Sequence, residues 1–128
     1  MKVQIRYEEG VKFVAQARMH QAVIDQPKEK GGSDAGMNPL EFFLTSLGSC
    51  VALYAKRYYK DTNLDFSGLT VDVESELSPE RPFRFTDIKL KVKLKNDIGD
   101  RREPFLRFIK NCPIHNTLAG QPNIDIDI

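Results

Sequence analysis

The sequence predicts an α+β domain that spans residues 1–128, with antiparallel sheets around a long central helix. Apolar residues recur at helical spacing between positions 38 and 61, and again between 101 and 111. On either side of these segments they alternate with polar residues, which is the period of a half-buried strand. The resulting order of strands, long helix, strands, short helices and strand is typical of an α+β domain.

The first part of the chain predicts a small antiparallel sheet. Residues 3–7 and 11–15 read as two strands joined by a glycine turn, and 21–24 as a third strand. The polar stretch 26–37 follows, with glycines at 31, 32 and 36, and predicts a mobile loop.

The central helix has a complete start signal. Asn38 is the expected N-cap, Pro39 occupies the first helical position, and Glu41 completes a capping box. The apolar stripe of this helix consists of Leu40, Phe43, Leu44, Leu47, Val51, Tyr54 and Tyr58. Because one small sheet covers so much apolar surface poorly, we expect the helix to pack against a second copy in a homodimer.

Period-two alternation returns after the helix. Residues 69–77 and 88–94 predict two strands, linked through the proline-rich stretch 79–82. The second strand turns Lys89, Lys91, Lys93 and Lys95 outward, which favours a solvated sheet face over a binding patch. A helix over 101–111 follows, and the isoleucines of 124–128 predict a final strand.

Composition narrows the functional class. The 128 residues are 41% hydrophobic and carry a net charge of +1, as in an ordinary soluble protein, and no basic block is present for nucleic acid. Two cysteines are too few for a secreted disulfide scaffold. Neither a signal peptide nor an apolar run long enough to span a membrane is present, so we expect a cytoplasmic protein without a membrane partner.

The two cysteines are the candidate reactive groups. Cys50 lies about three turns into the central helix, and Cys112 stands where a short helix ends and another can begin. A thiol at a helix start is easier to ionise, because free backbone N–H groups favour the thiolate. A redox pair and two small buried residues are both compatible with this pattern.

The two histidines do not indicate a metal site. His20 and His115 lack a close ligand pair of the kind that zinc sites show. His115 follows Cys112 by three residues, close enough to influence that thiol, although a surface histidine is the simpler interpretation. No phosphate loop, nucleophile elbow or paired-carboxylate site is found.

Two motifs resemble the OsmC/Ohr family of osmotically inducible and organic hydroperoxide resistance proteins. The first runs from the Asn38-Pro39 helix start, with Glu41 in the first turn, to Cys50. The second is the run 112–118, from Cys112-Pro113 to Leu118, which is similar to the family's resolving-cysteine motif. The element order agrees as well, so the resemblance covers essentially the whole chain.

The resemblance implies a two-cysteine, thiol-dependent peroxidase acting on organic hydroperoxides. Cys50 would be the peroxidatic residue and Cys112 the resolving one, with an external dithiol reducing their disulfide. Members resemble one another in forming an intertwined homodimer with active sites at the subunit interface. No metal, haem or flavin cofactor is implied, because sulfur carries the electrons.

The chain departs from the best-studied members around the reactive cysteine. Their catalytic Glu lies ten residues before the cysteine, whereas here that position is Leu40, and Glu41 precedes Cys50 by nine. Nine helical residues rise about 13.5 Å, so Glu41 cannot touch Cys50 along its own helix. Glu41 is therefore either a catalytic residue or only a helix cap.

The sequence also leaves open which positively charged residue would stabilise the Cys50 thiolate. Arg18, on the N-terminal strands that reach the family's dimer interface, is the first candidate, and a surface-exposed Arg18 is the alternative. Lys28, Lys30 and Arg57 are the other candidates.

Two further functions remain compatible with the sequence. A non-catalytic module on the same fold could bind a lipid-like or other small ligand, because function resides in the site and not in the fold. A structural protein with inert thiols is the third. Cysteines within disulfide reach, with Cα atoms about 4.4–6.8 Å apart, would favour the peroxidase.

Overall fold

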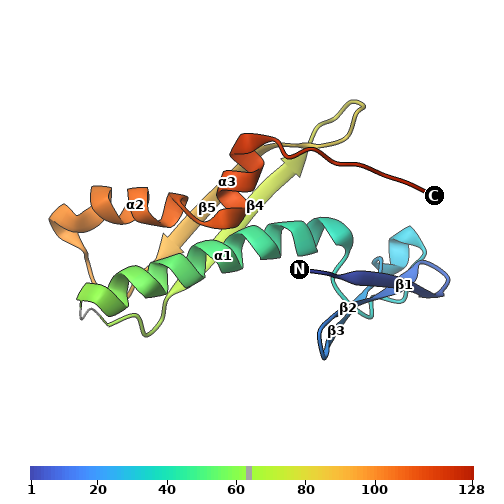
Figure 1. Cartoon of the computed structure of the whole chain (residues 1–128), viewed down its shortest axis with the longest axis horizontal. Helices are drawn as coiled ribbons and strands as arrows, with labels where there is room; N and C mark the ends of the chain where they lie inside the picture. The colour runs from blue at the N-terminus through green and yellow to red at the C-terminus, as the bar shows by residue number, and fades with distance from the viewer. Residues whose placement is uncertain (63–64) are drawn as a thin grey trace. The chain divides into compact units, whose positions relative to one another are not determined.

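The computed structural model describes residues 1–62 and 65–128, and it divides into two compact units, 1–43 and 44–128 (Figure 1). Helix α1, Pro39–Thr62, crosses the boundary between them. The α+β class is confirmed, whereas a single domain over residues 1–128 stays a prediction.

The first unit is built on a three-stranded antiparallel sheet. It comprises β1 (Gln4–Glu9), β2 (Lys12–Ala17) and β3 (His20–Ile24) in the order β1-β2-β3. The predicted hairpin and third strand are therefore confirmed. The register pairs Ile5 with Ala15 and Ala15 with Ala22 across the three strands. Every residue of β1 is exposed, so this sheet leaves apolar side chains on its surface.

The second unit contains the hydrophobic core. Strands β4 (Thr70–Leu77) and β5 (Phe85–Lys93) form an antiparallel hairpin. Helices α2 (Arg102–Lys110) and α3 (Pro113–Gly120) follow, and Figure 1 shows them gathered with α1 against the hairpin. Short 3-10 helices, η1 (Lys28–Lys30) and η2 (Gly99–Arg101), lie in the first and second unit respectively.

The core follows the four-residue spacing of α1. Leu47, Val51, Ala55 and Tyr59 are all buried, each one helical turn after the previous residue. They pack in one cluster with residues of α2 and its end, namely Phe105, Ile109 and Cys112. This cluster fixes α1 and the start of α3 beside each other.

Close contact between α1 and β4 depends on a glycine. Gly48 is buried, and a Cβ added to it would lie 2.7 Å from Cγ2 of Val73. Only a residue without a side chain fits this approach, and Gly48 lies two positions before Cys50. The packing of α1 on β4 at Gly48 thus sets how close the turn of α1 that carries Cys50 lies to β4.

One predicted strand is absent. The sequence predicted that Ile124, Ile126 and Ile128 end the chain in a strand, but the C-terminal residues are extended without any strand partner in the described part of the chain. The prediction of a strand was wrong because alternation specifies a face, whereas a strand also needs a neighbouring strand to bond.

Candidate functional site

Cys50 lies in the third turn of α1, on the side of the helix that faces the core. It is half-buried and packs against the core cluster next to Leu47 and Val51. The helix is continuous through this position, so the thiol is held on a rigid element and not on a loop. The residue is partly exposed to solvent although the helix around it is intact.

Cys112 is the N-cap of α3. Its backbone is extended, Pro113 occupies the first helical position, and its Sγ accepts a hydrogen bond of 3.4 Å from the His115 backbone N–H. The residue is 0% exposed. The sequence placed Cys112 correctly at a helix start, and the cysteine side chain serves as the cap there.

The structure brings the two side chains together. Both cysteines are free thiols, Cys50 packs against the core cluster that contains Cys112, and the two thiols are close enough for Cys50 to affect the pKa of Cys112. Burial raises the pKa of the Cys112 thiol, and the neighbouring Cys50 raises it further, whereas the backbone N–H groups of His115 and Ile114 oppose this. The expectation that the helix start makes Cys112 easier to ionise was wrong, because desolvation of the thiolate outweighs the helix end.

The two thiols are therefore neighbours with unequal surroundings. Cys50 has access to solvent, and Cys112 is enclosed and favours its neutral form. A thiol pair in contact can form a disulfide by reaction at the accessible sulfur followed by attack of the enclosed one. If the two cysteines were only small core residues without a shared role, their thiols would not need to be neighbours.

Glu41 completes the capping box that the sequence predicted. Its Oε2 accepts a hydrogen bond of 2.8 Å from the Asn38 backbone N–H. In return, the Asn38 Oδ1 accepts from the backbone N–H groups of Leu40 and Glu41. The carboxylate of Glu41 thus has a structural role at the start of α1, and a catalytic role stays a prediction.

The candidate cations are placed as follows. Arg18 lies exposed in the turn between β2 and β3, with a φ of 56°, and Lys28 and Lys30 lie exposed on η1. All three belong to the unit 1–43, whereas Cys50 belongs to the unit 44–128. The Arg57 guanidinium stacks over the Tyr54 ring at 5.2 Å. A contact of any of them with Cys50 stays a prediction.

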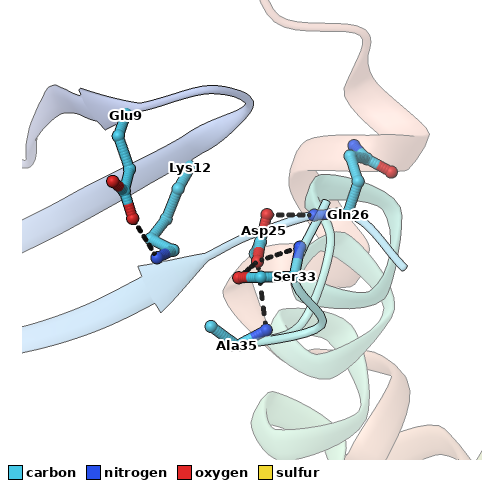
Figure 2. A network of polar contacts seen from close by, with 6 residues as sticks. All are labelled: Glu9, Lys12, Asp25, Gln26, Ser33 and Ala35. Atoms are coloured by element: carbon cyan, nitrogen blue, oxygen red, sulfur yellow. Dashed lines mark hydrogen bonds and ion pairs between the residues drawn. The ribbon is translucent and has the colours of Figure 1, made fainter. Parts of the chain in front are cut away.

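The loop 26–37 is organised by a buried carboxylate that the sequence analysis missed. Asp25 is 1% exposed and accepts hydrogen bonds from the backbone N–H groups of Gln26, Ser33 and Ala35 and from the Ser33 hydroxyl (Figure 2). The Ser33 hydroxyl foremost, with these N–H groups, holds the pKa of the Asp25 carboxyl well below its usual range.

The hydrogen bonds to Asp25 therefore give the loop 26–37 a defined conformation, whereas its polar and glycine-rich sequence predicted a mobile loop. Gly32 is required there, because a Cβ would collide with the carbonyl oxygen of Gln26. An acid at the end of a strand, followed by serine and glycines, was the available signal for such a turn. Beside it, Lys12 and Glu9 form an ion pair of 2.8 Å, also drawn in Figure 2.

The histidines take no part in a metal cluster among the described residues. No group of three His, Cys, Asp or Glu side chains there is placed to hold a metal ion. His20 is exposed at the start of β3, and His115 is half-buried. His115 contacts Cys112 through its backbone N–H, while its Nδ1 is buried without a partner among the described residues.

Comparison with known proteins identifies the family. A family model described as OsmC-like protein matches residues 31–127, which include both cysteines. The chain belongs to the OsmC-like family. No curated protein matches the chain.

Solved structures share the fold of this OsmC-like protein. One, from Psychrobacter arcticus, is named for osmotic stress induction and detoxification response; it is 18% identical, with 91% of this chain and 87% of that chain covered and a TM-score of 0.81. An OsmC-like protein from Mycoplasma pneumoniae is 24% identical, covering 94% and 87%, with a TM-score of 0.78. An organic hydroperoxide resistance protein OsmC from Legionella pneumophila is 16% identical, covering 93% and 88%, with a TM-score of 0.68.

The sequence also predicted that no apolar segment is long enough to span a membrane. None of the helices within residues 1–62 and 65–128 has both the length and the apolar character needed to cross a membrane.

Proposed function

We propose that this OsmC-like protein is a thiol-dependent peroxidase that reduces organic hydroperoxides with Cys50 and Cys112. The observation that carries the proposal is the contact between an accessible thiol on α1 and an enclosed thiol at the start of α3. Structural neighbours named as hydroperoxide resistance proteins agree with it.

The reaction would proceed in three steps. The Cys50 thiolate attacks the peroxide O–O bond, Cys50 becomes a sulfenic acid, and the alkoxide leaves as the alcohol after taking up a proton. The Cys112 sulfur then attacks the Cys50 sulfur, a disulfide forms, and the hydroxyl leaves as water with the Cys112 proton. An external dithiol returns two electrons and restores both thiols.

The unequal burial of the two thiols supports this order. A peroxide can reach half-buried Cys50, but it cannot reach Cys112, which is 0% exposed. The raised pKa of Cys112 favours its neutral thiol, which limits the oxidation of Cys112 by peroxide. The two residues therefore suit the peroxidatic and the resolving role respectively.

The proposal includes a homodimer in the cytoplasm. The exposed apolar face of the first sheet, with Val3, Ile5 and Tyr7 each more than half exposed, supports packing of this sheet on a second copy. In such a dimer Arg18, or else Lys28 or Lys30, would supply the cation beside Cys50. Arg18, Lys28 and Lys30 can be replaced by alanine one at a time. Only the replacement of the residue that supplies the cation should slow the oxidation of Cys50.

The test separates the two cysteines. Cys50→Ser should abolish consumption of an organic hydroperoxide in the presence of a dithiol. Cys112→Ser should still react once, leaving a Cys50 sulfenic acid that dimedone traps and mass spectrometry detects after one equivalent of peroxide. Excess peroxide should overoxidise this variant, because no second thiol resolves the sulfenic acid.

The outcomes are distinct. Labelling at Cys112 in Cys50→Ser, with none in Cys112→Ser, would reverse the assigned roles. Absence of labelling in both variants would reject the peroxidase. A Ser49→Ala variant, adjacent to Cys50 but exposed, serves as the matched control and should react as the unchanged protein does.

A further inference from the structure

The surroundings of the two cysteines bear on how their disulfide, once formed, can be reduced again. Cys112 is 0% exposed and belongs to the core cluster, together with Phe105 and Ile109 of α2. Cys50 lies on α1 at the border of this cluster and is partly exposed. Of the pair, Cys50 is therefore the residue that meets solvent.

Reduction of a disulfide has a direction. An incoming thiolate bonds to one sulfur, the S–S bond breaks, and the other sulfur leaves with the electron pair as a thiolate. Attack on Cys50 would leave the mixed disulfide on Cys50 and release Cys112, whereas attack on Cys112 would do the reverse. The rate of each path depends on access to the attacked sulfur and on how readily the other sulfur leaves.

Access favours attack on Cys50. A reductant that attacked Cys112 would first have to open the core cluster, in which Phe105 and Ile109 are 3% and 5% exposed. Opening a packed core is among the costliest local motions of a domain, so that path is rarely populated. The partly exposed Cys50 lies at the border of the cluster, where a smaller opening suffices.

The leaving sulfur needs groups that receive its negative charge. Burial raises the pKa of the Cys112 thiol, and a thiol with a raised pKa leaves more slowly. Cys112 is also the N-cap of α3, where the His115 backbone N–H donates to its Sγ at 3.4 Å and the Ile114 backbone N–H lowers its pKa. These donors of the helix start are in place before the S–S bond breaks, so they stabilise the charge where it develops.

We propose that an external dithiol reduces the Cys50–Cys112 disulfide by attacking the Cys50 sulfur, and that the backbone N–H groups of Ile114 and His115 stabilise the Cys112 thiolate that leaves. The second thiol of the reductant then attacks its own partner sulfur in the mixed disulfide. This step releases the Cys50 thiolate and closes the oxidised dithiol, and the two protons of the dithiol end on Cys50 and Cys112. The inference rests on the proposed function, to which it adds the direction of recycling and a catalytic role for the start of α3.

The test maps the mixed disulfide. Diamide, which removes two electrons from a thiol pair without any peroxide, converts the purified protein to its disulfide. The oxidised protein is mixed with 2-mercaptoethanol, a monothiol that forms the mixed disulfide, and the reaction is stopped early with excess N-ethylmaleimide. Peptide mass spectrometry should find the probe on Cys50 and the maleimide on Cys112, in at least about tenfold excess over the reverse pattern.

Every outcome of this experiment is decisive. The probe on Cys112, or on both residues equally, would overturn the proposal. In concentrated guanidinium chloride both residues are exposed and both should carry the probe, which is the control for the role of the fold. A disulfide that diamide forms and the probe opens at Cys50, in a protein that consumes no peroxide, would reject the proposed function and leave this inference intact. Failure of diamide to join the cysteines would reject their pairing and both proposals.

Charge variants at Pro113 test the role of the helix start. Pro113 is exposed at the first position of α3. Pro113→Glu, Pro113→Gln and Pro113→Lys all add the same backbone N–H and differ mainly in charge. Because a charge in the first turn acts on a thiolate at the helix start, reduction should be about two- to fivefold slower with Glu, and faster with Lys, than with Gln. These differences should shrink in about 1 M salt.

Two controls separate this effect from simpler ones. The thiolate of 2-mercaptoethanol is an anion, whereas that of cysteamine carries a compensating ammonium group, so the order of the three variants should be the same with both reagents. An order seen only with 2-mercaptoethanol would show that the charge steers the reagent and would reject the role of α3. Gln121→Glu adds the same charge at the other end of α3 and should leave the rate unchanged. Equal slowing by Gln121→Glu and Pro113→Glu would also reject it.

Discussion

Replacing Gly48 with alanine tests the packing that positions the cysteine-bearing helix. The new Cβ would lie 2.7 Å from Cγ2 of Val73, about 1 Å inside the 3.5–4.0 Å at which two carbon atoms attract each other. Val73 is β-branched and has little freedom to turn away. Overpacking of this kind costs about 1–3 kcal/mol, whereas alanine is about 1 kcal/mol better than glycine within a helix.

The two effects oppose each other, so the net change in the free energy of unfolding is a loss of up to about 2 kcal/mol. A second variant separates them. In a Val73→Ala background the colliding methyl is gone and the remaining Val73 Cβ is 4.0 Å from the new atom. There Gly48→Ala should stabilise by about 1 kcal/mol, which corresponds to a coupling free energy of about 1–3 kcal/mol.

Urea unfolding of the four proteins, followed by far-ultraviolet circular dichroism, measures this cycle. The decisive observation is the change of sign, because the helix propensity of alanine is the same in both backgrounds. If Gly48→Ala stabilises the protein equally with Val73 and with Ala at position 73, then α1 does not rest on β4 through Gly48 and the reasoning is refuted.

Three further predictions follow from buried groups. The carboxyl of Asp25 has a lowered pKa, so its stabilising effect on the fold is complete above the unfolded pKa of about 3.9 and is lost as the pH falls towards the folded pKa. In urea unfolding between pH 2 and 7, Asp25→Asn should remove this part of the acid sensitivity. Superimposable stability profiles of the variant and the unchanged protein would contradict this prediction. Tyr59 is 1% exposed, and its hydroxyl has no hydrogen-bond partner within the described residues. Tyr59→Phe should therefore raise the free energy of unfolding by about 1 kcal/mol in the same assay. A loss of stability would show that the hydroxyl has a hydrogen-bond partner. Iodoacetamide at pH 8 should modify Cys50 well before Cys112, because Cys112 is 0% exposed and burial raises its pKa; equal rates by mass spectrometry would contradict the enclosed site.

Local interactions were readable from the sequence because the partners are close along the chain. Asn38 and Glu41 are three residues apart, so their spacing alone predicted the capping box that the hydrogen bonds confirm. Cys112 before Pro113 likewise predicted a helix start. The periodicity of α1 predicted Leu47 and Val51 on its buried face, because each turn of a helix repeats the same face. Ala55 and Tyr59, which the predicted stripe left out, complete that face, whereas Leu40 and Phe43 are exposed.

Only the tertiary structure decided how distant residues act on one another. Contact between Cys50 and Cys112 depends on packing α2 against α1, and the resulting burial reverses the expected effect of the helix start on the Cys112 pKa. The hydrogen bonds that Asp25 receives from a loop up to ten residues later could not be read from spacing either. The isoleucines near the C-terminus showed which face a strand would bury, but whether it pairs depends on a neighbouring edge, which no local pattern contains.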